Sequence, residues 1–135
     1  MSFVLDASIA ASWALEPEGP PLADIAEHQL DRAGAVVPAI WSLEIRNALL
    51  MAERRGRISE ADVFGAVNSL AHMHIEIDRF QDADDVLAVA RRFRLTTYDA
   101  AYLELAQRRS IPLASLDRAL VAAARDAGVK LLDEV

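Results

Sequence analysis

Four carboxylates stand at positions where they could act together: Asp6, Glu44, Asp99 and Asp117. Asp6 directly follows the apolar run of residues 3–5. Burying an ionised carboxylate without a partner costs several kcal/mol, so its charge must meet water, a cation or a hydrogen-bond donor. If all four acids meet, their like charges raise one another's pKa, and a hard divalent cation such as Mg²⁺ or Mn²⁺ removes that conflict. Because such an ion activates water and stabilises a phosphoryl group in transfer, the acids predict a metal-dependent phosphoryl-transfer site.

Small polar residues flank these acids: Ser8, Asn47, Thr97 and Ser115. Asn47 lies one helical turn from Glu44, and each of the three hydroxyl residues lies two positions from an acid. We expect them to orient the carboxylates or metal-bound water, while Ser8 and Thr97 serve equally well as helix caps. The three histidines show no ligand spacing, and we expect them at the surface.

The acids can meet only if the chain places them at one edge of a sheet. Short apolar runs predict strands at residues 3–5, 35–37, 75–77, 112–116 and 129–132. Helical patterns fall between them, at about residues 9–15, 22–32, 40–55, 59–72, 82–93, 98–109 and 118–127. Alternating strands and helices imply an α/β fold, with a short parallel sheet covered by helices on both faces. In such a sheet the carboxyl ends of the strands and the starts of the following helices share one edge, where ligands bind.

Each charged group also has a simpler structural explanation. Asp6 could merely cap the helix after its strand, and the other three acids lie where a helix N-terminus favours an anion. The acidic residues of segment 82–85 are interpreted as a cap and first turn. Arginines cluster at residues 54–57, 91–94 and 108–109. Guanidinium groups suit phosphates, but these clusters lie at predicted helix C-termini, where the dipole favours cations in any case.

Length and composition narrow the class of protein. The chain has 135 residues, of which 53% are hydrophobic, so we expect one domain spanning residues 1–135. It contains no cysteine, which excludes disulfides and thiolate metal sites. No membrane span or signal peptide is visible, and a cytoplasmic protein is expected. The net charge of −7 argues against non-specific nucleic-acid binding, except where bound metal ions reverse the local sign.

Four stretches of the sequence resemble the PIN-domain ribonucleases, and especially their bacterial toxin branch, the VapC family. They are Val4-Leu5-Asp6-Ala7-Ser8, Glu44-Ile45-Arg46-Asn47-Ala48-Leu49, Thr97-Tyr98-Asp99-Ala100-Ala101-Tyr102-Leu103-Glu104-Leu105-Ala106 and Leu113-Ala114-Ser115-Leu116-Asp117. The stretches cover nearly the whole chain in the family's order and spacing. One departure is Ser115, which stands where the family often has threonine.

The resemblance implies a three-layer α/β/α sandwich and an endoribonuclease that depends on Mg²⁺, with Mn²⁺ as a possible substitute. It identifies Asp6, Glu44, Asp99 and Asp117 with the family's acidic quartet, Asp6 and Asp99 being the most direct metal ligands. It further implies the toxin of a type II toxin–antitoxin pair, with RNA as substrate. The expected partners are a second copy in a homodimer and a VapB-like antitoxin, in a dimer or a higher assembly, whose C-terminal segment blocks the acidic site.

The sequence argues against three other functions. A phospho-aspartyl phosphatase needs Asp-x-Asp, and the segment Asp6-Ala7-Ser8 lacks the second acid. A receiver-type switch needs a lysine at the end of a late strand, whereas Lys130 sits early in the last predicted strand. A non-catalytic PIN-like module that only binds RNA or protein would usually show a broken quartet, and this quartet is intact.

Overall fold

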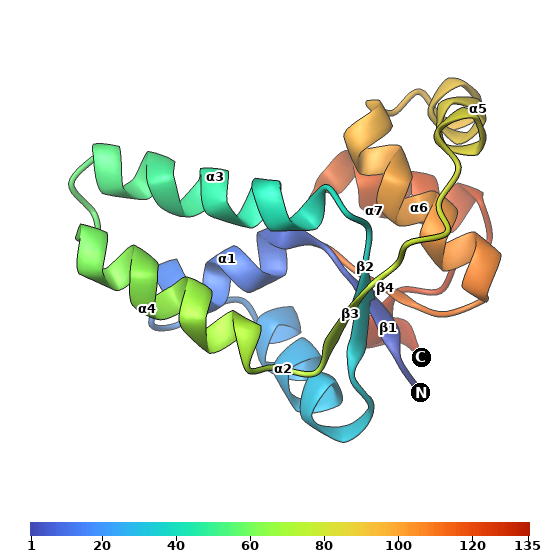
Figure 1. Cartoon of the computed structure of the whole chain (residues 1–135). Helices are drawn as coiled ribbons and strands as arrows, with labels where there is room; N and C mark the ends of the chain where they lie inside the picture. The colour runs from blue at the N-terminus through green and yellow to red at the C-terminus, as the bar shows by residue number, and fades with distance from the viewer.

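The computed structural model describes all residues, 1–135, and centres on a four-stranded parallel sheet (Figure 1). Its strands are β1 (Phe3–Leu5), β2 (Ala35–Val37), β3 (Ile75–Ile77) and β4 (Leu113–Ala114), in the spatial order β3-β2-β1-β4. All three pairings are parallel. The predicted parallel α/β fold is therefore confirmed, with β3 and β4 as the edge strands.

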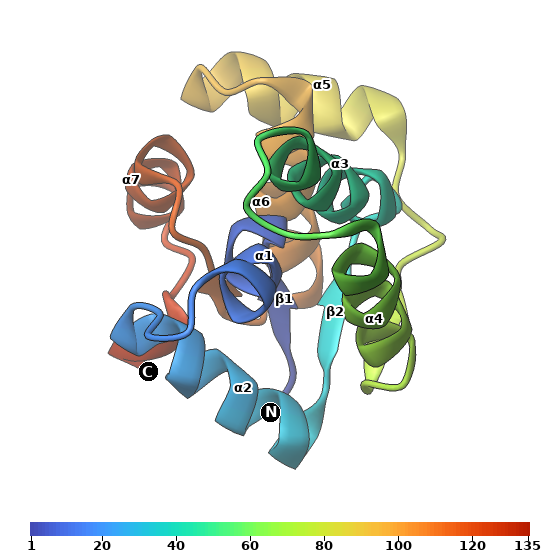
Figure 2. The same cartoon turned by 90° about the vertical axis from the view of Figure 1, so that its left-hand side faces the viewer.

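Seven α-helices cover the sheet on both faces. They are α1 (Ala7–Leu15), α2 (Pro21–Ala33), α3 (Trp41–Arg54), α4 (Glu60–Ala71), α5 (Ala83–Phe93), α6 (Thr97–Arg109) and α7 (Arg118–Asp126). Helices α1 to α4 pack on one face, while α5 and α6 lie on the other with α7 against α6 (Figures 1 and 2). This is the expected three-layer sandwich.

Local sequence signals set several helix boundaries. Ser59 and Asp62 form the predicted capping box at the start of α4, with each side chain bonded to the other residue's backbone N–H. Asp82 caps α5 through the N–H groups of Asp84 and Asp85, which confirms the structural interpretation of that acidic segment.

The core lies between β1 and the helices on either side of it. All three residues of β1 are completely buried, as a strand in the middle of a parallel sheet requires. Helix α6 is buried along most of its length, and its alanines allow close approach to the sheet and to α5. No helix combines the length and apolar composition needed to cross a bilayer.

The predicted last strand at residues 129–132 is wrong. Only one bridge forms there, between Leu113 and Leu131, and the chain then enters the 3₁₀ helix η1 (Leu132–Glu134). Strand β4 has only two residues, also fewer than predicted, so a fifth strand finds almost no ladder to extend. The apolar residues Leu131 and Leu132 are buried all the same. The apolar residues at this end of the chain are therefore explained by burial, and they do not indicate a strand.

Candidate active site

The four acids lie where strands end or where the following helices begin. Asp6 is the N-cap residue of α1, Glu44 and Asp99 lie in the first turns of α3 and α6, and Asp117 is the N-cap residue of α7. In Figure 1 this is the upper edge of the sheet, where β1 and β2 run into α1 and α3 and where α6 begins. Parallel strands bring these helix starts together although the acids span most of the sequence.

Asp6 is held by two serine hydroxyls from distant parts of the chain. Its side chain is nearly inaccessible, with 6% of the residue exposed. Ser8 Oγ and Ser115 Oγ each donate a hydrogen bond of 2.7 Å to Asp6 Oδ2. The side chain makes no capping bond to α1, so Asp6 is not simply a helix cap. Both bonds fall on one oxygen, which leaves Oδ1 for a further ligand.

The two serines are themselves fixed by the backbone after β4. Leu116 N donates to Ser8 Oγ and Asp117 N donates to Ser115 Oγ, each at 3.0 Å. The hydroxyls therefore accept from the β4–α7 connection and donate to Asp6. This chain of bonds ties the end of β1 to the end of β4 and fixes the orientation of the buried carboxylate.

Glu44 is held by a residue that sequence reasoning missed. Tyr102 Oη, from helix α6, donates a hydrogen bond of 2.6 Å to Glu44 Oε1. Tyr102 is completely buried. The available signal was its position three residues after Asp99, because residues three apart share a helix face.

The remaining two acids, Asp117 and Asp99, differ in the hydrogen bonds of their side chains. Asp117 Oδ1 accepts from Leu120 N at 2.9 Å and so caps α7. The Asp99 side chain has the Thr96 hydroxyl as its hydrogen-bond partner, which opposes in part the rise in its pKa. Of the two candidate caps for α6, Thr96 takes that role, with its hydroxyl accepting from Asp99 N at 3.1 Å.

Two of the four flanking polar residues do not reach the acids. Asn47 and Thr97 are exposed, and neither side chain forms a hydrogen bond. Ser8 and Ser115 contact Asp6 as described above. Only half of the predicted orienting set therefore lies against a carboxylate in this structure.

Burial and neighbouring negative charges raise the pKa of three of the four acids. Burial is the main cause of a raised pKa for Asp6, Glu44 and Asp99. The charge of Asp117 adds to this for Asp6 and for Asp99, and Asp6 and Asp99 both act on Glu44. Hydrogen bonds from the serines and from Tyr102 oppose these effects in part. The edge of the sheet thus concentrates negative charge that favours a compensating cation.

No basic side chain supplies that compensation. The ion pairs of the protein involve only Arg108, Arg109 and Arg125, and none reaches the four acids. As the chain stands, no three acidic, histidine or cysteine side chains are grouped closely enough to hold a metal ion together. The donors are nevertheless hard carboxylate oxygens, and buried Asp6 meets hydroxyls but no cation. That chemistry fits Mg²⁺ or Mn²⁺, whose charge would compensate acids that otherwise repel one another.

A fifth acid at a strand end, Asp78 after β3, shows the opposite arrangement. Arg108 Nη2 contacts Asp78 Oδ2 at 2.6 Å and Arg109 Nη2 contacts Oδ1 at 3.0 Å. Burial raises the pKa of Asp78, but the hydrogen bonds from the two arginines outweigh it and lower the pKa overall. Arg108 also pairs with Glu104, so this cluster fastens β3 to α6. Asp78 is therefore a neutralised structural acid and does not join the other four.

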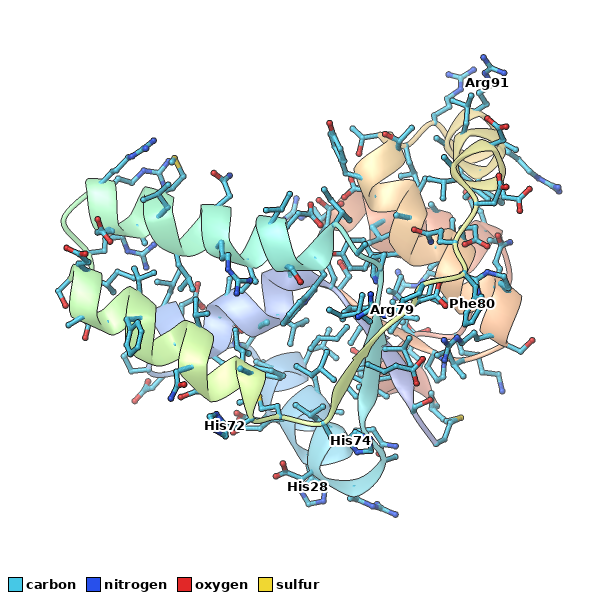
Figure 3. The ribbon with its side chains drawn as sticks, in the orientation of Figure 1. His28, His72, His74, Arg79, Phe80 and Arg91 are labelled. Atoms are coloured by element: carbon cyan, nitrogen blue, oxygen red, sulfur yellow. The ribbon has the colours of Figure 1, made fainter.

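The histidines do not contribute to the acidic edge. His28, His72 and His74 are exposed, as expected, and extend outward near the lower edge of Figure 3. His72 and His74 lie just before the start of β3, away from the carboxyl edge of the sheet. Because the histidines lie away from the four acids, a metal site that combines a histidine with these acids is excluded.

Comparisons with known proteins agree with the family resemblance and with the fold. The sequence profile of the PIN domain matches residues 3–126. The fold is similar to the crystal structure of PAE2754 from Pyrobaculum aerophilum, at 25% identity and a TM-score of 0.74, covering 98% of this chain and 85% of that one. A comparison with curated protein sequences gave no significant match.

Two further solved structures share the fold at lower identity. One is VapC20 of Mycobacterium tuberculosis, a Sarcin-Ricin loop cleaving toxin, at 14% identity and a TM-score of 0.61, covering 91% of this chain and 95% of that one. The other is FitAcB from Neisseria gonorrhoeae, at 18% identity and a TM-score of 0.53, covering 97% and 96%.

Proposed function

Because this chain belongs to the PIN-domain family, we propose that it is a Mg²⁺-dependent endoribonuclease and the toxin of a type II toxin–antitoxin pair. The observation that carries the proposal is the buried Asp6 carboxylate, which two serines orient, which interacts electrostatically with the other three acids, and which has no basic partner. Among its structural relatives, VapC20 is a Sarcin-Ricin loop cleaving toxin, which supports the same class of activity.

The proposed mechanism assigns each acid a role in holding the cation. Asp6 and Asp99 bind it most directly, and Glu44 and Asp117 complete the negative site. When bound, the cation supplies an activated water and positive charge for the phosphoryl group. The serine bonds hold Asp6 Oδ2, which would leave Oδ1 to bind the ion. The N-termini of α3 and α6 point toward the same edge and favour an anionic phosphate there.

A VapB-like antitoxin is proposed as the partner that silences this site. A cleft of about 260 Å³ between α3, α4 and the edge strand β3 supports a protein ligand, because eight of its ten lining residues are hydrophobic. A basic side chain from such a partner would compensate the four acids as a metal ion does. A homodimer, or a larger assembly with the antitoxin, is proposed on the family resemblance.

The decisive experiment is cleavage of total RNA by the purified protein with Mg²⁺ and with EDTA. We expect cleavage with Mg²⁺ alone, and its loss in Asp6→Asn and in Asp99→Asn, because each amide keeps the shape of the side chain but loses its charge. Asp78→Asn is a matched control: it alters a buried strand-end acid that the arginines hold apart from the site. A folded wild-type protein without nuclease activity would favour the non-catalytic binding module. Cleavage by Asp6→Asn at the wild-type rate would refute the assigned site.

A further inference from the structure

Tyr102 joins two helices that each carry an acid of the site. It lies on α6, the helix that begins beside Asp99, and its hydroxyl donates at 2.6 Å to Glu44 on α3. The bond links positions 58 residues apart, and the tyrosine ring is completely buried. The hydroxyl therefore holds one particular oxygen of Glu44, namely Oε1.

Asp6 shows the same arrangement with different donors. Its Oδ2 accepts both serine hydroxyls, while Glu44 Oε1 accepts the tyrosine hydroxyl. In each case one oxygen is occupied by a neutral donor and the other stays available. Donors behind a metal ligand restrict its rotation, which is how surrounding residues tune metal affinity.

A purely structural explanation for the Tyr102–Glu44 bond is incomplete. Burial of a tyrosine hydroxyl requires an acceptor, and Glu44 provides one. Phenylalanine would fill the same space without that requirement. Glu44 is only partly buried, so water could solvate its carboxylate. Neither core packing nor solvation of Glu44 therefore requires the Tyr102 hydroxyl. Its remaining effect is to fix the orientation of the Glu44 carboxylate.

We propose that Tyr102 is a positioning residue: its hydroxyl holds Glu44 Oε1 and leaves Oε2 as the oxygen that would serve the proposed cation site. The inference rests on the proposed metal site, but it does not depend on RNA being the substrate. Tyr102 acts through Glu44 and touches neither the cation nor the substrate.

The test compares Tyr102→Phe with Tyr98→Phe. The control removes the same hydroxyl from a tyrosine on the same helix, but Tyr98 is 60% exposed and forms no hydrogen bond. Mn²⁺ affinity is measured by titration calorimetry without RNA, thermal unfolding is followed in EDTA, and RNA cleavage is assayed over a range of Mn²⁺ concentrations. We expect Tyr102→Phe to weaken Mn²⁺ binding by about 10- to 100-fold and Tyr98→Phe to leave it unchanged. Excess Mn²⁺ should largely restore cleavage by Tyr102→Phe.

A double variant separates positioning from general damage to the fold. With Glu44→Ala there is no carboxylate left to orient, so adding Tyr102→Phe should weaken Mn²⁺ binding no further. If Tyr102→Phe and Glu44→Ala weaken Mn²⁺ binding independently, so that their effects add in the double variant, the inference is overturned. A Tyr102→Phe protein that binds Mn²⁺ like wild type would also overturn it.

The nuclease proposal and this inference can fail separately. A wild-type protein that cleaves no RNA, yet loses Mn²⁺ affinity on Tyr102→Phe, refutes the nuclease and supports the positioning role. Normal cleavage and normal Mn²⁺ binding in Tyr102→Phe refute the positioning role alone. Absence of Mn²⁺ binding by the wild type overturns both.

Discussion

Replacement of Asp6 by asparagine tests whether the buried carboxylate destabilises the ion-free protein. The amide has nearly the same shape as the carboxylate. Its oxygen can accept the hydrogen bonds of Ser8 and Ser115, and its NH₂ group takes the place of Oδ1. The substitution therefore removes charge while it leaves the packing and both hydrogen bonds in place.

The expected gain follows from the burial and hydrogen bonds of Asp6. Enclosing an ionised carboxylate costs several kcal/mol, and its two hydrogen bonds, at about 1.5–3 kcal/mol each, offset only part of this. The neutral amide keeps both bonds at about 0.5–1.5 kcal/mol each and avoids the desolvation of a charge. Without divalent ions at pH 7.5, we expect the free energy of unfolding to rise by about 1–3 kcal/mol. For a chain of this size that is roughly 4 °C in Tm per kcal/mol.

The stability that Asp6→Asn gains over the wild type should depend on pH in a direction set by the pKa of Asp6. Burial raises the pKa of Asp6 in the folded state above its ordinary value of 3.8. The folded wild type then binds protons more tightly than the unfolded chain, so its stability falls as the pH rises through the folded-state pKa. The advantage of Asp6→Asn should be full at neutral pH and should disappear below about pH 4, where the carboxyl is protonated in both states.

Divalent cations should stabilise the wild type much more than Asp6→Asn. If the wild type binds Mg²⁺ with a Kd of roughly 1 mM, then about 10 mM Mg²⁺ stabilises it by about 1.4 kcal/mol. That corresponds to a rise in Tm of roughly 4–8 °C. Asp6→Asn should show little of this rise because it has lost a ligand. Function and stability should therefore oppose each other at this residue.

The assay is a set of thermal and urea unfolding curves for both proteins, in EDTA and in Mg²⁺, at several pH values. Asp78→Asn serves again as the control, since its charge is compensated by two arginines and its loss should lower stability in EDTA. The reasoning is refuted if Asp6→Asn is less stable than wild type in EDTA at neutral pH and gains as much from Mg²⁺. Asp6 would then be a structural acid whose charge the fold requires.

Two further predictions concern the arginines. Arg108→Ala should lower the free energy of unfolding by about 2–4 kcal/mol in urea titrations, because it leaves buried Asp78 and Glu104 without their shared partner; an unchanged midpoint would show that Arg109 alone compensates Asp78. The arginines of residues 91–94 end α5 immediately before the start of α6, and Arg91 extends outward at the end of α5 (Figure 3). Neutralising them should weaken RNA binding and flatten its salt dependence more than the same change at residues 54–57, at the far end of α3 from Glu44. Equal slopes for the two sets would mean that neither lines the RNA path.

Much of the fold could be predicted from the sequence because its signals are local. Ser59 and Asp62 are three residues apart, and their capping box forms as the spacing indicates. The apolar run before Asp6 is a central strand, and alternation of strands with helices is enough to imply a parallel sheet. The shared edge of Asp6, Glu44, Asp99 and Asp117 follows from that topology alone. The apolar end of the chain misled the prediction, because a lack of polar residues does not distinguish a strand from a buried turn.

The orientation of the acids was decided only by tertiary structure. Ser115 reaches Asp6 across 109 positions, and Tyr102 reaches Glu44 across 58. No local period encodes such contacts, which depend on how α6 and the β4–α7 connection pack against the first half of the chain. Helix dipoles explained the arginines at the end of α6 equally well until the structure placed Asp78 within reach of Arg108 and Arg109. Sequence therefore determined which charges share an edge, because strand and helix order is local. Packing determined which of those charges are compensated by a basic side chain and which are not, because hydrogen bonds form only between groups that the finished fold brings within about 3 Å.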